Sequence, residues 1–210
     1  MSDDDLTLAE LLCARLCHDL SGPVGAAAAG AELLDDLGEA ALDGDTLGLV
    51  AASAAAAAAR LKFFRAAFGP TGRTQDAGAL RALIEGYLDS STSAAAPILG
   101  LDWRVTGTEP PAATARLLLN LVLIARDALP RGGAIEVTLA DDAWTVIARG
   151  TPTTLADEAR SVLIDGAAAS GPRGAQALLA HRLALAIPAT LDLQIEAGAV
   201  TFAIAAAQRR

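Results

Sequence analysis

The segment His18-Asp19-Leu20-Ser21-Gly22-Pro23 brings together residue types whose spacing suits one kind of chemistry. His18 supplies an imidazole, Asp19 supplies an adjacent carboxylate, and Pro23 removes one backbone N–H from a predicted helix. Neutral imidazole is a good nucleophile near pH 7, because its ordinary pKa is about 6.5. The segment therefore has the groups needed to carry a phosphoryl group on a ring nitrogen, with Asp19 orienting the ring and fixing its tautomer.

Helical periodicity over residues 6–37 predicts that His18 points outward. At about 100° per residue, five apolar residues form one stripe that we expect to be buried: Leu12, Leu16, Leu20, Ala27 and Leu34. His18 lies about 200° from Leu16, and the outward face also carries Gly22, Gly25, Ala29 and Glu32. Each helical glycine costs about 1 kcal/mol relative to alanine. We therefore interpret this open face as a docking surface for another protein.

Other interpretations of this helix stay open at the level of sequence. His18 could be an ordinary surface residue beside a tolerated proline kink. Arg15, one turn earlier, could screen a transferred phosphoryl group at the docking surface, or be a solvated charge. Cys13 and Cys17 share a helix face, but a zinc site normally has four ligands and His181 is the only other histidine. We expect both cysteines to be small buried residues near the helix seam.

Two long helices, 6–37 and 46–68, are expected to form a hairpin with a turn near residues 38–45. We expect Asp5 or Thr7 to cap the first helix. Because two helices bury little surface, the economical arrangement is a homodimer whose hairpins form a four-helix bundle. This hairpin would make up a first domain, residues 1–70, followed by a polar linker over 71–76.

The second domain, residues 77–210, is predicted to be α+β, with an antiparallel sheet and helices on one face. Helices are expected at 77–91, 112–128, 154–164 and 173–187, and strands at 101–105, 134–140, 143–149, 191–196 and 199–205. The strands 134–140 and 143–149 would form a hairpin across Asp141 and Asp142.

The charge and cysteine content of the chain argue against some functions and favour one location. The net charge of −9 argues against nucleic-acid binding, which needs a basic patch. Because the two cysteines lie on one predicted helix, we expect no disulfide framework. This favours a reducing compartment. The acidic N-terminus lacks the basic start of a signal peptide, and we identify no apolar run suited to span a bilayer. We expect a soluble cytoplasmic protein.

The run Cys17-His-Asp-Leu-Ser-Gly-Pro23, followed by Glu32-Leu33-Leu34, resembles the phosphoacceptor helix of bacterial sensor histidine kinases. It is more similar still to the ChpT-type histidine phosphotransferases. This resemblance implies a dimeric helical hairpin followed by a domain like the kinase ATP-binding domain. It also implies that receiver domains dock beside His18, with Asp36 and then Thr46, Val50 or Ser53 adding to the surface.

Three segments of the second domain can be compared with the ATP-binding motifs of these kinases. Arg116-Leu-Leu-Leu-Asn120-Leu121 looks like the first part of the kinase asparagine box, but Ile124 stands where a second asparagine should hold magnesium. Ala148-Arg149-Gly150 replaces the adenine-binding Asp-x-Gly motif, and Gly171-Pro-Arg-Gly174 is a shortened glycine-rich lid. These differences imply a degenerate domain without nucleotide, metal or other cofactor, the magnesium being held by the receiver.

The resulting hypothesis is a phosphotransferase that relays a phosphoryl group through His18, from the receiver domain of a hybrid kinase to a response regulator. Partners would be those receivers and a second copy of the chain, with neither nucleic acid nor membrane. Two rivals are an active histidine kinase with a divergent ATP site, which Asn120 favours, and a non-enzymatic dimeric scaffold.

Overall fold

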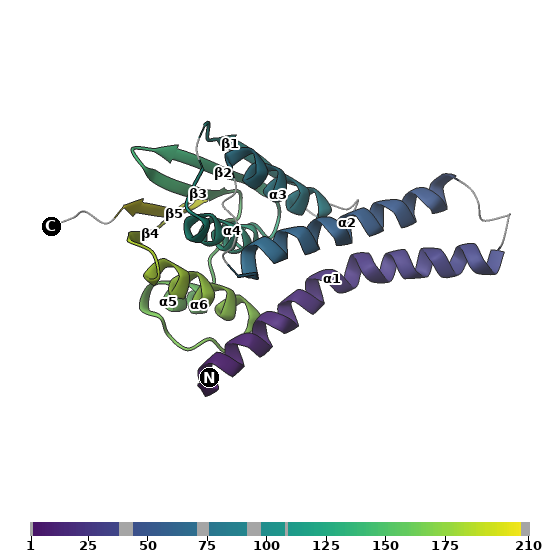
Figure 1. Cartoon of the computed structure of the whole chain (residues 1–210), viewed down its shortest axis with the longest axis horizontal. Helices are drawn as coiled ribbons and strands as arrows, with labels where there is room; N and C mark the ends of the chain where they lie inside the picture. The colour runs from purple at the N-terminus through teal and green to yellow at the C-terminus, as the bar shows by residue number, and fades with distance from the viewer. Residues whose placement is uncertain (1, 38–43, 71–75, 92–97, 108, 207–210) are drawn as a thin grey trace.

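The first two helices lie side by side as a long hairpin in the computed structural model, which describes residues 2–37, 44–70, 76–91, 98–107 and 109–206 (Figure 1). α1 spans Asp3–Leu37 and α2 spans Gly44–Phe68. The expected turn at 38–43 and linker at 71–75 lie outside the described residues. Ser2, rather than Thr7, caps α1 by accepting from the Asp5 N–H at 3.2 Å, while Asp5 accepts from the Ser2 N–H at 3.1 Å.

The two helices approach closely where Gly30 of α1 faces Val50 of α2. A Cβ on Gly30 would lie only 2.5 Å from Val50 Cγ2. Most of α2 is nevertheless exposed, and its buried residues are Ser53, Phe63, Phe64 and Ala67. Contrary to the sequence-based expectation, α2 is long and apolar enough, by length and composition alone, to cross a membrane. Such a helix needs a partner for its open apolar surface.

The C-terminal end of α2 is built into the core of the α/β domain. Phe63 stacks on Tyr87 of α3 (Ala77–Ser90), with ring centroids 4.3 Å apart. Both rings are almost fully buried, and burial raises the pKa of Tyr87 to about 12. Aromatic pairs of this kind add about 0.5–1.5 kcal/mol beyond the area that they bury. The hairpin is therefore anchored to the α/β domain at its base.

The sheet is mixed, not purely antiparallel as expected. Its order is β1-β2-β3-β5-β4, and β1 pairs with β2 in parallel, with Leu101 opposite Ile135. The elements are β1 Leu99–Arg104, α4 Ala112–Asp127, β2 Gly133–Ala140, β3 Ala143–Arg149, α5 Asp157–Asp165, α6 Pro172–Leu185, β4 Ala189–Glu196 and β5 Ala199–Ala206. The parallel pair arises because α4 connects β1 to β2 as a crossover, so both strands run in the same direction.

The other strand pairs match the expectation. β2 and β3 are antiparallel across Asp141 and Asp142, which both have positive φ, as a two-residue hairpin turn requires. Alternate residues of β3 and β5 are buried, among them Val146, Ala148 and Phe202, so one face of the sheet packs on the helices.

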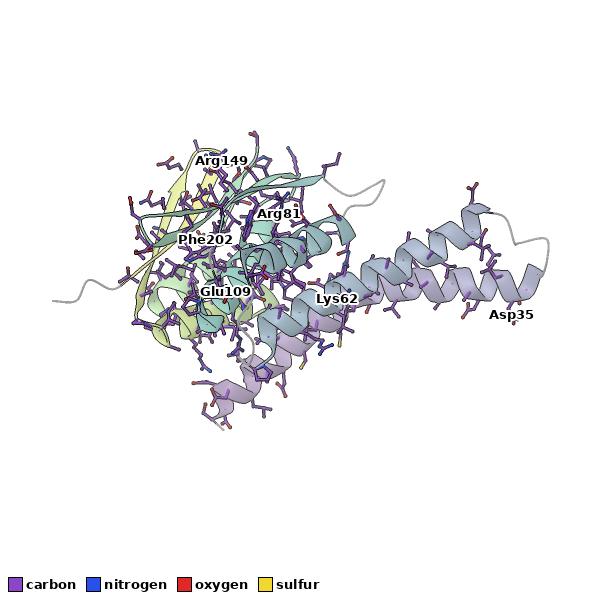
Figure 2. All side chains as sticks on the ribbon, turned by 45° about the horizontal axis from the view of Figure 1, so that its top comes forward. Asp35, Lys62, Arg81, Glu109, Arg149 and Phe202 are labelled. Atoms are coloured by element: carbon purple, nitrogen blue, oxygen red, sulfur yellow. The ribbon has the colours of Figure 1, made fainter. Side chains whose placement is uncertain are left out.

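Figure 2 shows Phe202 inside the α/β domain and Asp35 at the far end of the hairpin. The expected fold class, a helical hairpin followed by an α+β domain, is confirmed, with the parallel pairing of β1 and β2 as the one departure in the sheet.

Candidate active site

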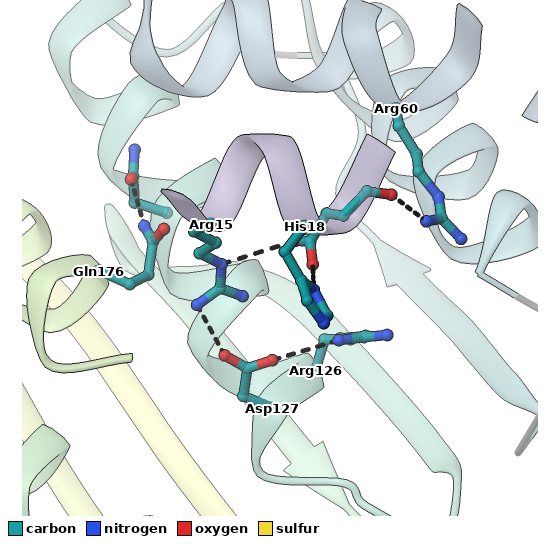
Figure 3. Close-up of polar contacts among 8 residues, drawn as sticks. Arg15, His18, Arg60, Arg126, Asp127 and Gln176 are labelled. Carbon is teal, nitrogen blue, oxygen red and sulfur yellow. Dashed lines mark hydrogen bonds and ion pairs between the residues drawn. The ribbon is translucent and has the colours of Figure 1, made fainter. Parts of the chain in front are cut away.

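His18 projects from α1 into solvent, with 87% of its side chain exposed (Figure 3). Its Nδ1 lies 3.1 Å from Asp19 Oδ1. An ionised carboxylate only accepts hydrogen bonds, so this contact requires the proton on Nδ1. The lone pair of the neutral ring is then on Nε2. The expected partnership of His18 and Asp19 is thus present in the geometry, and it leaves Nε2 as the nucleophilic atom.

Arg15 does not lie on the exposed docking face where the sequence placed it. Its side chain is only 6% exposed, and its Nη1 lies 2.8 Å from Asp127 Oδ2 at the end of α4. Its Nε is also 3.7 Å from Asp19 Oδ2. Burial disfavours the charge, but the carboxylates of Asp127 and Asp19 outweigh that effect and raise the pKa of Arg15. The buried Arg15 guanidinium therefore interacts with the Asp19 carboxylate and is not exposed for contact with a partner protein.

The outward face of α1 is open as expected. Gly22, Gly25, Ala29 and Glu32 are all exposed. Among the described residues, no heavy atom lies within 4 Å of a Cβ placed on Gly22 or Gly25. Of the positions expected from the start of the second helix, Ser53 is buried and Val50 packs on Gly30. These two belong to the contact between α1 and α2, because the second helix turns that side toward α1.

A cleft of about 580 Å³ opens beside His18, between α1 and the α/β domain. Its walls include Arg126 and Asp127 from α4 and Arg173 from the first turn of α6. Arg126 Nη1 lies 3.3 Å from Asp127 Oδ1. Arg126 and Asp127 could not be recognised from the sequence, because an Arg-Asp pair at a helix end carries no local signal of a contact more than a hundred residues away.

Asn120, the residue that favoured an active kinase, is fully buried and bonded within the chain. Its Nδ2 donates to the carbonyls of Ala67 at 2.9 Å and Arg116 at 2.7 Å, and its Oδ1 accepts from Gln176 Nε2 at 2.6 Å. These bonds tie the end of α2 to α4 and α6. The side chain has a structural explanation that needs no ligand.

Two of the positions that the resemblance to kinases compared with an ATP site, Ile124 and Ala148, are apolar and enclosed. Ile124 is 3% exposed and Ala148 is 0% exposed. Neither side chain has an atom that could coordinate magnesium or accept a hydrogen bond from an adenine amine.

Glu158 holds the start of the Gly171–Gly174 segment, which the sequence compared with a glycine-rich lid. Its Oε1 accepts from the Ser170 N–H at 2.7 Å, the Ser170 hydroxyl at 2.9 Å and the Gly171 N–H at 3.2 Å. These bonds, the Ser170 backbone bond foremost, lower the pKa of Glu158. A Cβ on Gly174 would clash with the same carboxylate. A helix N-terminus of this kind would otherwise suit a phosphate, but the chain's own carboxylate occupies it.

Cys13 and Cys17 are both free and exposed, whereas their spacing had predicted two buried residues near the helix seam. In the parts of the chain that the structure describes, no group of three or more His, Cys, Asp or Glu side chains is placed to hold a metal ion. His181 is half-buried, and its Nδ1 lies 2.9 Å from the Leu163 carbonyl.

Known proteins that are similar to this chain in sequence or structure are described as phosphotransferases. A family model described as the histidine phosphotransferase C-terminal domain matches residues 77–199. The protein phosphotransferase ChpT of Brucella abortus (strain 2308) is 37% identical over 137 residues, which are 64% of this chain and 61% of that protein. The match therefore spans less than two thirds of that relative. A solved structure described as a bacterial phosphotransferase at 1.7 Angstrom aligns with a TM-score of 0.77 and 28% identity, over 97% of both chains.

Proposed function

Because this chain belongs to the histidine phosphotransferase family, we propose that it relays a phosphoryl group from an aspartate of one receiver domain to an aspartate of another through His18. The observation that carries the proposal is the state of His18. Its ring is exposed, and the bond from Nδ1 to Asp19 leaves the Nε2 lone pair free. The family relatives named as phosphotransferases support the same activity.

In the transfer step the Nε2 lone pair of His18 attacks the phosphorus of an aspartyl phosphate on the donor. The bond between phosphorus and the donor oxygen breaks, and the donor carboxylate leaves with its electron pair. His18 keeps its proton on Nδ1, where Asp19 stabilises the positive charge that develops on the ring. The reverse sequence delivers the phosphoryl group to the acceptor aspartate. Positioning and electrostatics supply most of the catalysis in such transfers.

We further propose that the α/β domain binds no ATP and that His18 is loaded only by a partner. Three features support this. Asn120 is committed to Ala67 and Gln176, Ile124 and Ala148 are buried and apolar, and Glu158 occupies the N–H groups at the start of α6. The magnesium needed for transfer would come with the receiver domain, as the family resemblance implies.

A homodimer would cover the open sides of the hairpin. Large apolar side chains are exposed along both arms: Leu6, Val24, Leu33, Leu47, Leu49 and Leu61. A second copy packed against them would complete a four-helix bundle. Sedimentation equilibrium of the purified chain without detergent tests this directly. A dimer mass is expected. A monomer would contradict the bundle, and a species that needs detergent to stay in solution would contradict the cytoplasmic location that we propose.

The proposed function is tested by loading the chain from a phosphorylated receiver domain. We expect label on the wild-type protein and none on His18→Gln, which keeps polarity but lacks a nucleophilic ring nitrogen. The variant should retain the dimer mass. A labelled His18→Gln protein would contradict transfer through His18, and an unlabelled wild type that still binds receivers would favour a scaffold.

A further inference from the structure

Pro23 leaves one backbone carbonyl of α1 without its helical partner. In a regular helix the N–H of residue 23 would donate to the carbonyl of Asp19, but proline has no N–H. This carbonyl belongs to the residue whose carboxylate contacts His18 Nδ1. The vacancy therefore lies at the backbone of the candidate active site itself.

Arg60 of α2 fills that vacancy. Its Nη1 donates to the Asp19 carbonyl across the hairpin (Figure 3). The same guanidinium also donates through Nη2 to the Ser90 carbonyl at 2.7 Å and through Nε to Ser90 Oγ at 3.3 Å. Ser90 is the last residue of α3, where carbonyls lack helical partners and the helix dipole favours a cation.

We propose that Arg60 is a positioning residue for phosphoryl transfer, a role that rests on the proposed function of His18. By bonding to the carbonyl that Pro23 leaves free, Arg60 fixes the Asp19 peptide plane and, through the Asp19 carboxylate, the orientation of the His18 ring. Its bonds to Ser90 hold that fixed point against the α/β domain. Because these hydrogen bonds go to Asp19 and Ser90 and not to the His18 ring, Arg60 acts through Asp19.

A double-mutant cycle between Arg60 and Pro23 tests this role. Arg60→Ala should slow loading of His18 from a phosphorylated receiver at saturating receiver by about tenfold or more, because small misplacements of reacting groups are costly. Pro23→Ala restores a backbone N–H that can bond to the Asp19 carbonyl, so adding Arg60→Ala should then change the rate by less than about twofold. Arg65→Ala, at an exposed arginine of the same helix, is the matched control and should match wild type.

If Arg60 only holds the α/β domain in place, Arg60→Ala will be equally harmful with and without Pro23, which would overturn the proposal. A wild-type rate for Arg60→Ala would also overturn it. If wild-type protein takes up no label at all, the proposed function fails instead, so the two failures are distinguishable.

Imidazole ¹⁵N spectra give a readout that does not depend on activity. The chain has two histidines, so His181 serves as an internal reference. In Arg60→Ala we expect the His18 Nδ1 resonance to shift while His181 keeps its position, and the shift to disappear in the Pro23→Ala background. Unchanged His18 resonances, or equal disturbance of both histidines, would contradict a positioning role. Arg60→Lys, which has no fork to bridge two carbonyls, should give an intermediate shift.

Discussion

Arg15 and Asp127 form an ion pair, 2.8 Å between Nη1 and Oδ2, that joins the helix carrying His18 to the end of α4. Both side chains are largely buried, with 6% and 14% of their surfaces exposed. A second contact, Arg182 Nη1 to Asp5 Oδ1 at 2.7 Å, lies on the surface near the start of α1. These two ion pairs hold the first half of α1 against the α/β domain, and Arg15 also lies 3.7 Å from Asp19.

Removing one member of the buried pair should destabilise the protein strongly. Asp127→Ala leaves the Arg15 charge without its closest partner, and we expect a loss of about 3–5 kcal/mol in the free energy of unfolding. Urea denaturation followed by circular dichroism measures this loss. The double variant Arg15→Met, Asp127→Leu should lose much less. A loss in the double variant equal to the sum of the losses in Arg15→Met and Asp127→Leu would show that the pair is not coupled.

Asp19→Asn should impair transfer more than it impairs folding. The amide no longer requires the proton on Nδ1, so part of the population would present a protonated Nε2 that cannot attack phosphorus. We expect the rate of loading from a phosphorylated receiver to fall by roughly 10²-fold. Asp35→Asn, at the exposed far end of the same helix, is the control and should retain the wild-type rate. A wild-type rate for Asp19→Asn would remove Asp19 from the mechanism.

Asn120→Ala tests whether Asn120 is structural. The change leaves Gln176 Nε2 without its buried acceptor, at a cost of about 1–3 kcal/mol for an unsatisfied group, and it leaves the Ala67 carbonyl with Arg116 Nε, at 3.2 Å, as its side-chain donor. Thermal unfolding should show a clear loss of stability, while loading of His18 from a receiver, measured at a temperature where the variant is folded, should stay near wild type. Normal stability combined with lost activity would instead indicate a catalytic role.

Much of the fold was predictable because its local signals agree with its tertiary structure. The helices around His18 and Asn120 have clear apolar periodicity, and the turn at Asp141 and Asp142 separates two strands of alternating pattern. The parallel pairing of β1 with β2 was missed, although a strand, a helix and a strand in succession indicate a crossover. The succession of elements is present in the sequence, but the periodicity of each element alone does not show which strands run parallel.

The long-range polar contacts could not be predicted from one sequence. Arg15 has the spacing of an exposed residue on α1, and only the position of α4 shows that Asp127 buries it. Likewise, the sequence indicated that Pro23 frees a carbonyl, but not that Arg60 reaches it. Cys13 and Cys17 were expected in a seam that the single chain leaves exposed. Such contacts depend on how distant elements pack, which hydrophobic periodicity does not encode.

Glu158 predicts a specific dependence of stability on pH. Its pKa is lowered in the folded chain, chiefly by the Ser170 N–H and hydroxyl. A group with a lowered folded pKa stabilises the fold above its ordinary pKa, and that contribution is lost as the pH falls through the folded value. Glu158→Gln should therefore melt below wild type at pH 7, and the difference should shrink as the pH falls below the ordinary value of 4.5 and through the lowered pKa of the folded chain. A difference independent of pH would show that the charge of Glu158 is not involved.

The most direct test of the account is a pair of incubations of the purified chain, one with γ-labelled ATP and one with a labelled phosphorylated receiver domain. His18→Gln is run in parallel in both. We predict that the wild-type chain is labelled by the receiver alone, that His18→Gln is labelled by neither, and that the label is stable in alkali and lost in acid, as a phosphoramidate bond requires. Label arriving on His18 from ATP alone would contradict the account and make the chain an autokinase, with Ile124, Ala148 and Glu158 compatible with nucleotide binding after all.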